Sequence, residues 1–383
     1  MKRLAKLAML GSCLLVLIAP VITMVHPFVH EEPLGGVVPP EQREPLSLHG
    51  VWTEHWQAKL RGWFEQSYGF KPSLVRLDNS IGYYALHETR PDKTVRIGEG
   101  DWLFLAGQVD FDNQTTDARE SVIVHARKIR AAQDALAARG KVLVFMILPS
   151  KTSLFPEKMP TRWVAPLGSP RPWQTMSYEP FVAELERTGA LFVDGPRLLA
   201  PLLHDKPDVL YSQWGRHLNP PASCLVLEAA LALARPRLPD KTIPPLDCSY
   251  DMKPVRPWSE ELDLFRLLNV WAPTPAVDIP TMRAVPDTVP LASRADVLVV
   301  GSSFGGRTIR EIDRNHTFGT THFFYYNASV EVLGQPLYPL PKPGSAEWRA
   351  LALSKDLILL PVPQEFIPSD GAFLDSVIEA LAH

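Results

Sequence analysis

Residues 295–306 have the sequence ADVLVVGSSFGG, in which an apolar run stops at a turn of glycines and serines. The run is mostly β-branched, which is typical of a strand buried on both faces of a sheet. Apolar residues return at helical spacing after the turn, so we expect a helix there. Ligands bind at the carboxyl ends of strands in open α/β sheets, where a following helix directs its free N–H groups. Ser303 is therefore a candidate nucleophile; the alternative is that Ser302 and Ser303 only cap the helix.

Two further apolar runs, residues 142–148 and 356–362, predict buried strands of the same sheet. The first follows directly on a helical pattern over residues 120–138, as in half of a parallel α/β unit. A shorter strand is expected at residues 322–326 and a closing helix at residues 371–381. The sequence therefore predicts an α/β fold with a mostly parallel central sheet.

Length, charge and proline content limit the class of protein. The 383 residues can bury the core of a full α/β domain with additional elements. A net charge of −3 gives no basic field that would attract nucleic acid. The 38 prolines lie mainly in connecting segments, including a proline-rich insertion around residues 236–290 with one helical pattern over residues 259–270. Loops of this length often lie over functional sites.

The N-terminus predicts export across a membrane. Lys2, Arg3 and Lys6 precede an uncharged run over residues 7–25, which is just long enough to cross a bilayer core at about 1.5 Å per residue. The basic flank predicts a cytoplasmic N-terminus and an exported remainder. No small-x-small cleavage site follows the run, so we expect an uncleaved anchor, with a cleaved signal peptide as the alternative.

These features divide the chain into three parts. Residues 1–29 are expected to form the membrane-spanning signal anchor, residues 30–48 a linker rich in proline and glutamate, and residues 49–383 the exported domain. The exported domain is then expected outside the cytoplasm, held at the membrane by the N-terminal helix.

Cysteine usage agrees with export. Cys13 lies in the uncharged N-terminal run, so Cys224 and Cys248 are the remaining pair. An oxidising compartment would allow a disulfide between them. The chain has no CxxC motif and no histidine-rich ligand set, so we expect neither a metal site nor a cofactor.

His217 is the histidine best placed to act as the base that a serine nucleophile needs. It lies between an apolar segment and a helix, in a loop of polar, glycine and proline residues where a side chain can face a cleft. A triad also needs a carboxylate that orients the imidazole. No acidic residue lies within a few positions of His217, and the nearest one upstream is Asp208, which is the possible acid. A histidine without function at a helix entry is the alternative.

Four motifs in order carry a resemblance to a known family. They are GEGDWLF at residues 98–104, LPSKTSLFPEKMP at residues 148–160, His217 with Asn219-Pro220, and GSSF at residues 301–304. With these motifs the chain resembles the alginate O-acetyltransferases AlgJ and AlgX and their relatives in exopolysaccharide biosynthesis, within the SGNH hydrolase-like group. The order and spacing of the motifs extend the resemblance over residues 41–370.

The resemblance implies a three-layer SGNH or flavodoxin-like fold and an extracytoplasmic enzyme that transfers acetyl groups to hydroxyls of an exopolysaccharide through an acetyl-serine intermediate. It implies Ser303 as the nucleophile and His217 as the base. A membrane-bound O-acyltransferase would supply the acetyl group. The residues expected at the oxyanion or the substrate are Gly305, Arg307, Tyr326 and Asn219.

The sequence departs from the family pattern beside the base. The family aspartate two residues before the histidine corresponds to Gly215, and the family tryptophan after the histidine corresponds to Leu218. A dyad, an acid from elsewhere such as Asp208, and a protein without catalysis are all consistent with this pattern. The alternative functions are accordingly a catalytically inactive polysaccharide-binding or scaffold subunit, and a carbohydrate acetylesterase that uses water as the acceptor.

Overall fold

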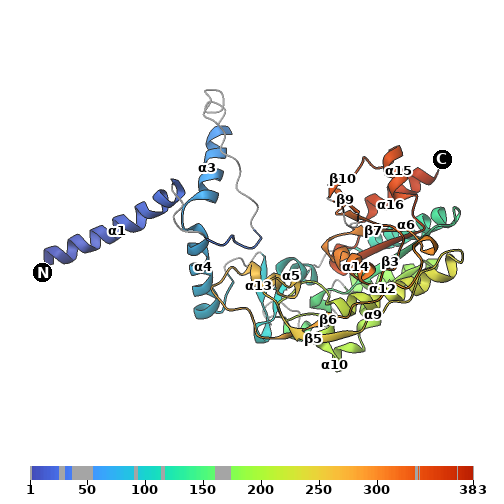
Figure 1. The fold of residues 1–383 in the computed structure, drawn as a ribbon, viewed down its shortest axis with the longest axis horizontal. Helices are drawn as coiled ribbons and strands as arrows, with labels where there is room; N and C mark the ends of the chain where they lie inside the picture. The colour runs from blue at the N-terminus through green and yellow to red at the C-terminus, as the bar shows by residue number, and fades with distance from the viewer. Residues whose placement is uncertain are drawn as a thin grey trace. The chain divides into compact units, whose positions relative to one another are not determined.

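The computed structural model describes residues 2–25, 31–36, 55–89, 94–113, 117–159, 174–332, 335, 337–368 and 370–382. The chain divides into two compact units (Figure 1). The N-terminal unit comprises Met1–Val95 with Phe265–Pro273, and the sheet unit comprises Arg96–Leu264 with Thr274–His383. Most of the predicted linker at residues 30–48, and its junction with the predicted domain, lie outside the described residues.

The N-terminal unit is helical. It contains α1 (Lys2–Val25), α3 (His55–Ser67) and α4 (Lys71–Ile81), and α4 continues as the π-helical turn η1 (Gly82–Leu86). Among the residues that the structure describes, no helix is both long enough and apolar enough to pass through a membrane. The membrane-spanning helix expected within residues 1–29 is therefore not confirmed.

The sheet unit is built on a seven-stranded sheet with the order β10-β9-β8-β7-β11-β3-β4. The five strands from β8 to β4 are parallel, as predicted. β9 and β10 extend the β8 edge as antiparallel strands, so the sheet is mixed. The reason is the three-residue connection from β8 to β9, which is too short for a parallel crossover. The strands are β3 (Val142–Leu148), β4 (Phe192–Asp194), β7 (Val297–Gly301), β8 (Thr321–Tyr325), β9 (Ser329–Val332), β10 (Tyr338–Pro339) and β11 (Leu357–Pro363).

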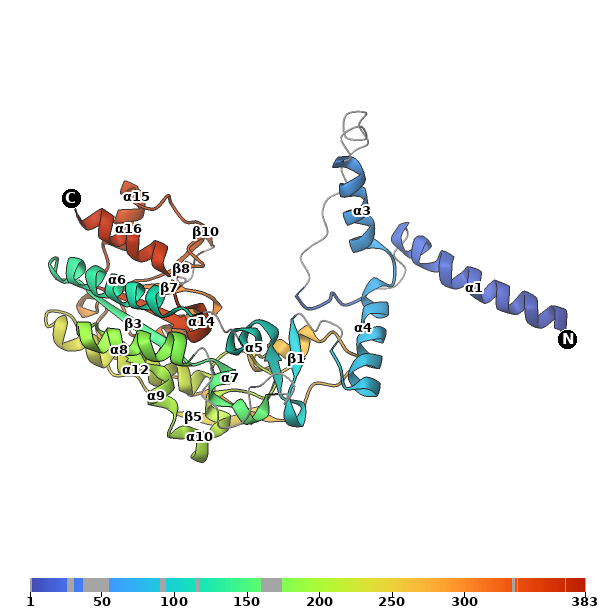
Figure 2. The ribbon, with the colours of Figure 1, turned by 180° about the vertical axis from the view of Figure 1, so that it is seen from behind.

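Helices cover both faces of this sheet, which gives the predicted three layers (Figure 2). One face packs against α12 (Pro220–Ala234) and α14 (Ser303–Arg314). The opposite face packs against α6 (Arg119–Ala137), α8 (Glu179–Thr188) and α16 (Gly371–Leu381). β7 is followed by a helix on the first face and its neighbour β11 by a helix on the second, so the carboxyl ends of these two strands flank a topological switch point.

The sequence of β3 and α6 explains why these elements form. All seven residues of β3 are buried, because the strand is covered on both faces. α6 buries Val122, Ala126, Ile129 and Leu136, which recur at helical spacing on one side. The chain turns after this helix at Gly140, whose φ of 68° is left-handed and costs glycine little.

The proline-rich insertion contains more structure than the sequence predicts. β5 (Tyr250–Pro254) and β6 (Asp278–Met282) form a two-stranded antiparallel sheet. Between them lie the 3-10 turn η7 (Glu260–Leu262) and α13 (Asp263–Leu267). A single helix was predicted over residues 259–270, so the helical segment is confirmed in part and the strands were missed. Proline masks strand periodicity because it is depleted in strands.

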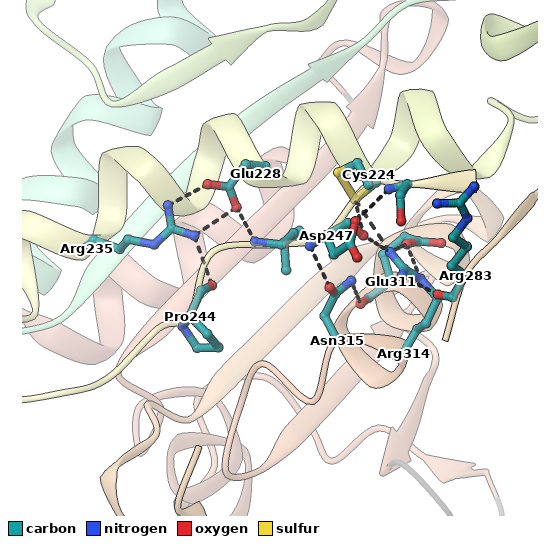
Figure 3. The surroundings of a disulfide bond; sticks show 12 residues. Cys224, Glu228, Arg235, Pro244, Asp247, Arg283, Glu311, Arg314 and Asn315 are labelled. Atoms are coloured by element: carbon teal, nitrogen blue, oxygen red, sulfur yellow. Dashed lines mark hydrogen bonds and ion pairs between the residues drawn. A yellow bond between two sulfur atoms is a disulfide. The ribbon is translucent and has the colours of Figure 1, made fainter. Parts of the chain in front are cut away.

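The predicted disulfide between Cys224 and Cys248 is present (Figure 3). It joins α12 to the start of the insertion. The same segment is held by Glu228, which accepts from the Leu246 amide at 2.8 Å, and by Arg314, which donates to the Asp247 carbonyl oxygen at 2.5 Å (Figure 3). The insertion is thus attached to both helices on this face of the sheet.

The remaining elements are short. A separate two-stranded sheet consists of β1 (Val95–Ile97) and β2 (Leu103–Leu105). The others are η2 (Glu99–Asp101), α5 (Ala106–Asp112), α7 (Lys151–Leu154), η3 (Pro156–Lys158), η5 (Gln174–Tyr178), α9 (Gly195–Leu199), α10 (Leu202–Asp205), α11 (Pro207–Leu210), η6 (Arg235–Arg237), η8 (Leu291–Ser293), α15 (Ala346–Ala352) and η9 (Gln364–Phe366).

Candidate active site

The two serines in the turn after β7 have different roles. Ser302 is the N-cap of α14, and its Oγ accepts from the Phe304 amide at 3.4 Å. Ser303 is the first residue of the helix, and its hydroxyl is turned toward a histidine instead. The capping alternative therefore applies to Ser302 and leaves Ser303 available for chemistry.

His217 and Ser303 are brought together from positions 86 residues apart. The Nε2 atom of His217 lies 3.0 Å from the Oγ atom of Ser303, within reach for proton transfer. The imidazole also packs on Phe304, with 4.7 Å between ring centroids. The predicted pair of residues is thus in contact at the carboxyl end of β7.

The carboxylate beside His217 is Asp263, which the sequence did not identify. Its Oδ2 atom lies 2.7 Å from Nδ1 of His217, and its Oδ1 atom accepts from the Arg216 amide at 2.8 Å. With both oxygens engaged, the carboxylate can hold the imidazole in one orientation. The side chains of His217 and Asp263 are only 11% and 16% exposed, so the three groups form a largely shielded relay.

Asp208 is not the acid of this relay, which corrects the expectation from sequence. It lies in α11, and its backbone carbonyl oxygen accepts from the Asn219 side-chain amide at 2.6 Å. The acid instead comes from the insertion, 46 residues after His217. The helical pattern at residues 259–270 has three acidic residues near its start, but nothing in the sequence singles out Asp263 among them.

Asn219 and Arg307 are not placed as expected at the substrate. Asn219 is 1% exposed, and its amide binds the Asp208 carbonyl oxygen, so it stabilises the loop that carries His217. Arg307 is also buried and forms ion pairs with Glu260 at 3.0 Å and Glu261 at 2.9 Å. These two carboxylates directly precede the Leu262-Asp263 segment, so Arg307 positions the acid.

Glu260 is shared with the next turn of α14. Arg310 donates to its Oε2 atom at 2.6 Å. Burial alone would raise the pKa of the Glu260 carboxyl, but the hydrogen bond from Arg310 and the charges of Arg307 and Arg310 bring that pKa below its ordinary value. Glu260 therefore stays ionised and keeps its two guanidinium partners.

Gly215 lies two residues before His217, where the family pattern has its aspartate, and the packing around it explains why no acid is present at this position. A Cβ atom at this position would lie 3.0 to 3.2 Å from backbone atoms of Glu261. That separation is closer than ordinary van der Waals contact, so a side chain at position 215 would push away the segment that carries Asp263. The glycine permits the close approach of the insertion.

Lys151 holds the same loop from the other side. Its fully buried Nζ atom lies within hydrogen-bond distance of the carbonyl oxygens of Leu103 (2.8 Å), Ser212 (2.7 Å), Gln213 (2.9 Å) and Gly215 (2.9 Å). The ammonium also lies 5.0 Å from the ring centroid of Trp102. Burial lowers the pKa of Lys151 well below its ordinary value. Sequence motifs contained this lysine but gave no indication of its role.

Gly305 was expected to offer its amide to an oxyanion, and the structure corrects this. The Gly305 N–H donates to the Ser302 carbonyl oxygen at 2.8 Å. A Cβ atom here would lie 2.8 Å from the Phe323 ring, so the glycine allows α14 to pack on the sheet. The amide of Ser303, the first in α14, is the remaining candidate donor of this turn.

Tyr326 lies near the site but on a different side of the turn. It is 53% exposed, has a left-handed φ of 51°, and donates its amide to the Gly301 carbonyl oxygen at 2.9 Å. Its side chain lines a cavity of about 210 Å³ with Ser302 and Asp370. Contact of Tyr326 with a substrate at Ser303 stays a prediction.

Two cavities flank α14. The one that contains Ser303 has a volume of about 420 Å³ and is lined by Gly306, Arg310 and Tyr325 among others. The other, of about 720 Å³, lies between α14 and the β5-β6 hairpin and does not include Ser303. Within the described residues, no cluster of three or more histidine, cysteine or acidic side chains could hold a metal ion.

Comparison with known proteins adds family information to this geometry. Residues 95–248 match the family described as SGNH hydrolase-like domain, acetyltransferase AlgX. The probable alginate O-acetylase AlgJ of Pseudomonas syringae pv. tomato is 26% identical over 159 residues, and that of Pseudomonas aeruginosa is 27% identical over 167 residues. Each match covers 42% of this chain and spans 36% and 39% of the respective relative, well under half of its length.

Two solved structures match this chain with lower sequence identity than these relatives. The O-acetyltransferase domain of Pseudomonas putida AlgJ has 15% identity and a TM-score of 0.45, over 75% of this chain and 99% of that one. AlgX of Pseudomonas aeruginosa has 16% identity and a TM-score of 0.41, over 74% of this chain and 65% of that one.

Proposed function

We propose an O-acetyltransferase function for this chain, which is an AlgJ/AlgX-like member of the SGNH hydrolase-like acetyltransferases. The observation that carries the proposal is the relay of Asp263, His217 and Ser303, with separations of 2.7 Å and 3.0 Å. These are the three roles of a serine-based acyl-transfer site: an orienting acid, a base and a nucleophile. The substrate would be the hydroxyl groups of an exopolysaccharide.

In the first half-reaction, the Ser303 Oγ atom attacks the carbonyl carbon of an acetyl donor while His217 Nε2 takes the hydroxyl proton. The tetrahedral oxyanion is bound by the Ser303 amide at the positive end of α14. When the intermediate collapses, the bond to the leaving group breaks and His217 returns the proton to that group. Asp263 stabilises the imidazolium in between, and acetyl-serine remains.

In the second half-reaction, a sugar hydroxyl attacks the acetyl carbon and gives its proton to His217. The ester bond to Ser303 breaks, and the proton passes to the Ser303 oxygen, which restores the hydroxyl. The product is an O-acetylated sugar. With water as the attacking group, the same steps hydrolyse the ester, which is the acetylesterase alternative.

An exported location and a membrane partner belong to the same proposal. The Cys224–Cys248 disulfide supports an oxidising compartment such as the periplasm, because disulfides are rare in the cytosol. A membrane-bound O-acyltransferase would supply the acetyl group there. Anchoring to the inner membrane stays a prediction from the basic residues and the uncharged run at the N-terminus.

Gly215 no longer favours an inactive scaffold subunit. That alternative depended on an absent acid, and Asp263 occupies the position beside His217. The test is acetyl transfer from an artificial ester such as p-nitrophenyl acetate to an oligosaccharide. We expect Ser303→Ala and His217→Ala to lower the rate by at least about a thousandfold.

A matched control is Ser345→Ala. Ser345 is the N-cap of α15, and its Oγ accepts from the Trp348 amide at 3.1 Å, so the variant loses a helix cap away from the relay. We expect it to keep its activity. Equal rates for Ser303→Ala and the parent protein would exclude the acetyl-serine mechanism.

A further inference from the structure

The cavity that contains Ser303 has an unequal distribution of charge. We call it the acidic groove and define it by Ser303, Glu260, Arg310, Asp313, Tyr325 and Glu331. Its lining includes three carboxylates and one guanidinium. Arg310 is already paired with Glu260. Asp313 and Glu331 form no ion pair within the described part of the chain, so the lining holds two carboxylates without a partnered cation.

The acidic groove follows one face of α14. Ser303, Arg310 and Asp313 are seven and three residues apart, a spacing that places them in a row along a helix. Glu331 comes from β9, where it pairs with Phe323 of β8. The two carboxylates thus come from the helix and from the sheet, and an acceptor that reaches Ser303 through the groove passes beside both.

From these charges we infer that the acceptor of the proposed transferase is a polysaccharide without negative charge near the acetylated hydroxyl. The inference rests on the proposed function and names its acceptor class. Hydroxyls of an uncharged sugar can donate to Asp313 and Glu331, and the apolar face of the ring can pack on Tyr325. A uronate carboxylate in the same place would be repelled by these like charges. We expect this repulsion to lower the affinity for the uronate by about tenfold.

The test uses two acceptors that differ only at C6, where one is neutral and the other charged. β-1,4-Mannohexaose and β-1,4-mannuronate hexamer have the same stereochemistry, and each C6 hydroxymethyl group of the first is a carboxylate in the second. We expect the full chain, given p-nitrophenyl acetate as donor, to acetylate the neutral hexamer with a kcat/KM at least about tenfold higher, equivalent to about 1.4 kcal/mol. An equal or higher value for the uronate would overturn the inference.

Charge-removing variants test whether the groove causes the preference. In the double variant Asp313→Asn, Glu331→Gln we expect the ratio of the two kcat/KM values to fall about tenfold, mainly through a lower KM for the uronate. The matched control is Asp240→Asn, Glu379→Gln, which removes the same charges from exposed positions outside the groove and should leave the ratio unchanged. An unchanged ratio in the groove variant would also overturn the inference.

Failure of this inference is distinguishable from failure of the proposed function. Release of p-nitrophenol that depends on Ser303 reports acetyl-serine formation with water as acceptor, whatever the sugar. If that release is present and the uronate is preferred, the acceptor class is wrong and the transferase mechanism stands. If Ser303→Ala releases p-nitrophenol as fast as the parent protein, the mechanism itself is wrong, and the inference fails with it.

Discussion

Two buried cations hold the two halves of the relay, and they bind different partners. Lys151 binds four neutral carbonyl oxygens, three of them in residues 212–215 just before His217. Arg307 binds the carboxylates of Glu260 and Glu261, just before Asp263. The base is therefore positioned by hydrogen bonds to backbone, and the acid by charge pairs between side chains.

Because the partners differ, removing each cation leaves a different kind of buried group without a partner. Without Lys151, several buried carbonyl oxygens lose a donor, at a cost of about 1–3 kcal/mol for each that stays unsatisfied. Without Arg307, the buried Glu261 keeps a negative charge with no partner, which typically costs about 3–5 kcal/mol. A second mutation can remove that carboxylate, but no mutation can remove a backbone carbonyl.

The largest expected effect is chemical and leaves both cations in place. Asp263→Asn keeps the size of the side chain but removes the charge that stabilises the imidazolium. We expect kcat for p-nitrophenyl acetate to fall by about four orders of magnitude with little change in Tm. Asp208→Asn is the control, since Asp208 is exposed and its contact with Asn219 uses only its backbone oxygen. Equal losses in the two variants would contradict the assignment of Asp263.

Lys151→Met is expected to have the largest effect on stability. It removes a donor shared by four carbonyl oxygens, three of them in buried hydrogen bonds, so the free energy of unfolding should fall by about 4 kcal/mol, measured by chemical denaturation. Lys158→Met is the matched control, because the Lys158 ammonium lies 6.0 Å from the centroid of the same Trp102 ring without those carbonyls. A change of about 1 kcal/mol or less is expected there.

Arg307→Met should lower the free energy of unfolding by about 3 kcal/mol and slow the esterase reaction, because the Asp263 segment loses its main ion pairs. The double variant Arg307→Met, Glu261→Gln should recover most of the stability, since the unpaired buried charge is gone. No comparable rescue is available for Lys151→Met. If the double variant is no more stable than Arg307→Met, charge pairing is not what holds this segment.

Gly215→Ala tests the contact between the two halves directly. The added Cβ atom would approach the Glu261 backbone to between 3.0 and 3.2 Å, so the insertion must move by a few tenths of an ångström. We expect a loss of about 2 kcal/mol in the free energy of unfolding and a lower kcat as His217 and Asp263 separate. Gly107→Ala in α5 is the control, because a Cβ atom at that position has no neighbour within 4 Å and Gly107 does not line the cavity that contains Ser303. A lower kcat is the readout that a stability effect alone would not give.

The smallest expected effect is a difference in pH dependence, because lysine can lose its proton in the folded state and arginine cannot. Burial lowers the pKa of Lys151 in the folded state below its ordinary value of 10.5. Just below pH 10.5 the unfolded chain then binds more protons than the folded chain, so stability rises with pH, by up to about 1.4 kcal/mol per unit.

The pH effect is isolated by comparing variants. The stability difference between the parent protein and Lys151→Met should change with pH in denaturation experiments at pH 8, 9 and 10. The difference between the parent protein and Arg307→Met should stay constant over the same range. A constant difference for both variants would mean that Lys151 keeps its proton throughout this range.

The residues of the candidate site that could be predicted are those that lie in a recognisable local sequence pattern. The strand, turn and helix around Ser303 follow from an apolar run and glycines within ten residues, and His217 lies in a loop marked by glycine and proline. Asp263 was missed because nothing local distinguishes it from other acidic residues of the insertion. Arg307 was expected at the substrate, whereas the structure pairs it with Glu261 and Glu260. These partners lie 46 and 47 positions earlier in the chain, so the sequence gives no sign of the ion pairs.

The sequence by itself determined the α/β class, the disulfide partners, and the candidate nucleophile and base that the structure places in contact. Periodicity and turn residues act over a few positions, and so they can be recognised without tertiary structure. Only the tertiary structure decided which carboxylate meets His217, why position 215 is glycine, and what Lys151 binds. Those contacts join segments that are far apart in the chain, and the folded core alone brings them within hydrogen-bond distance.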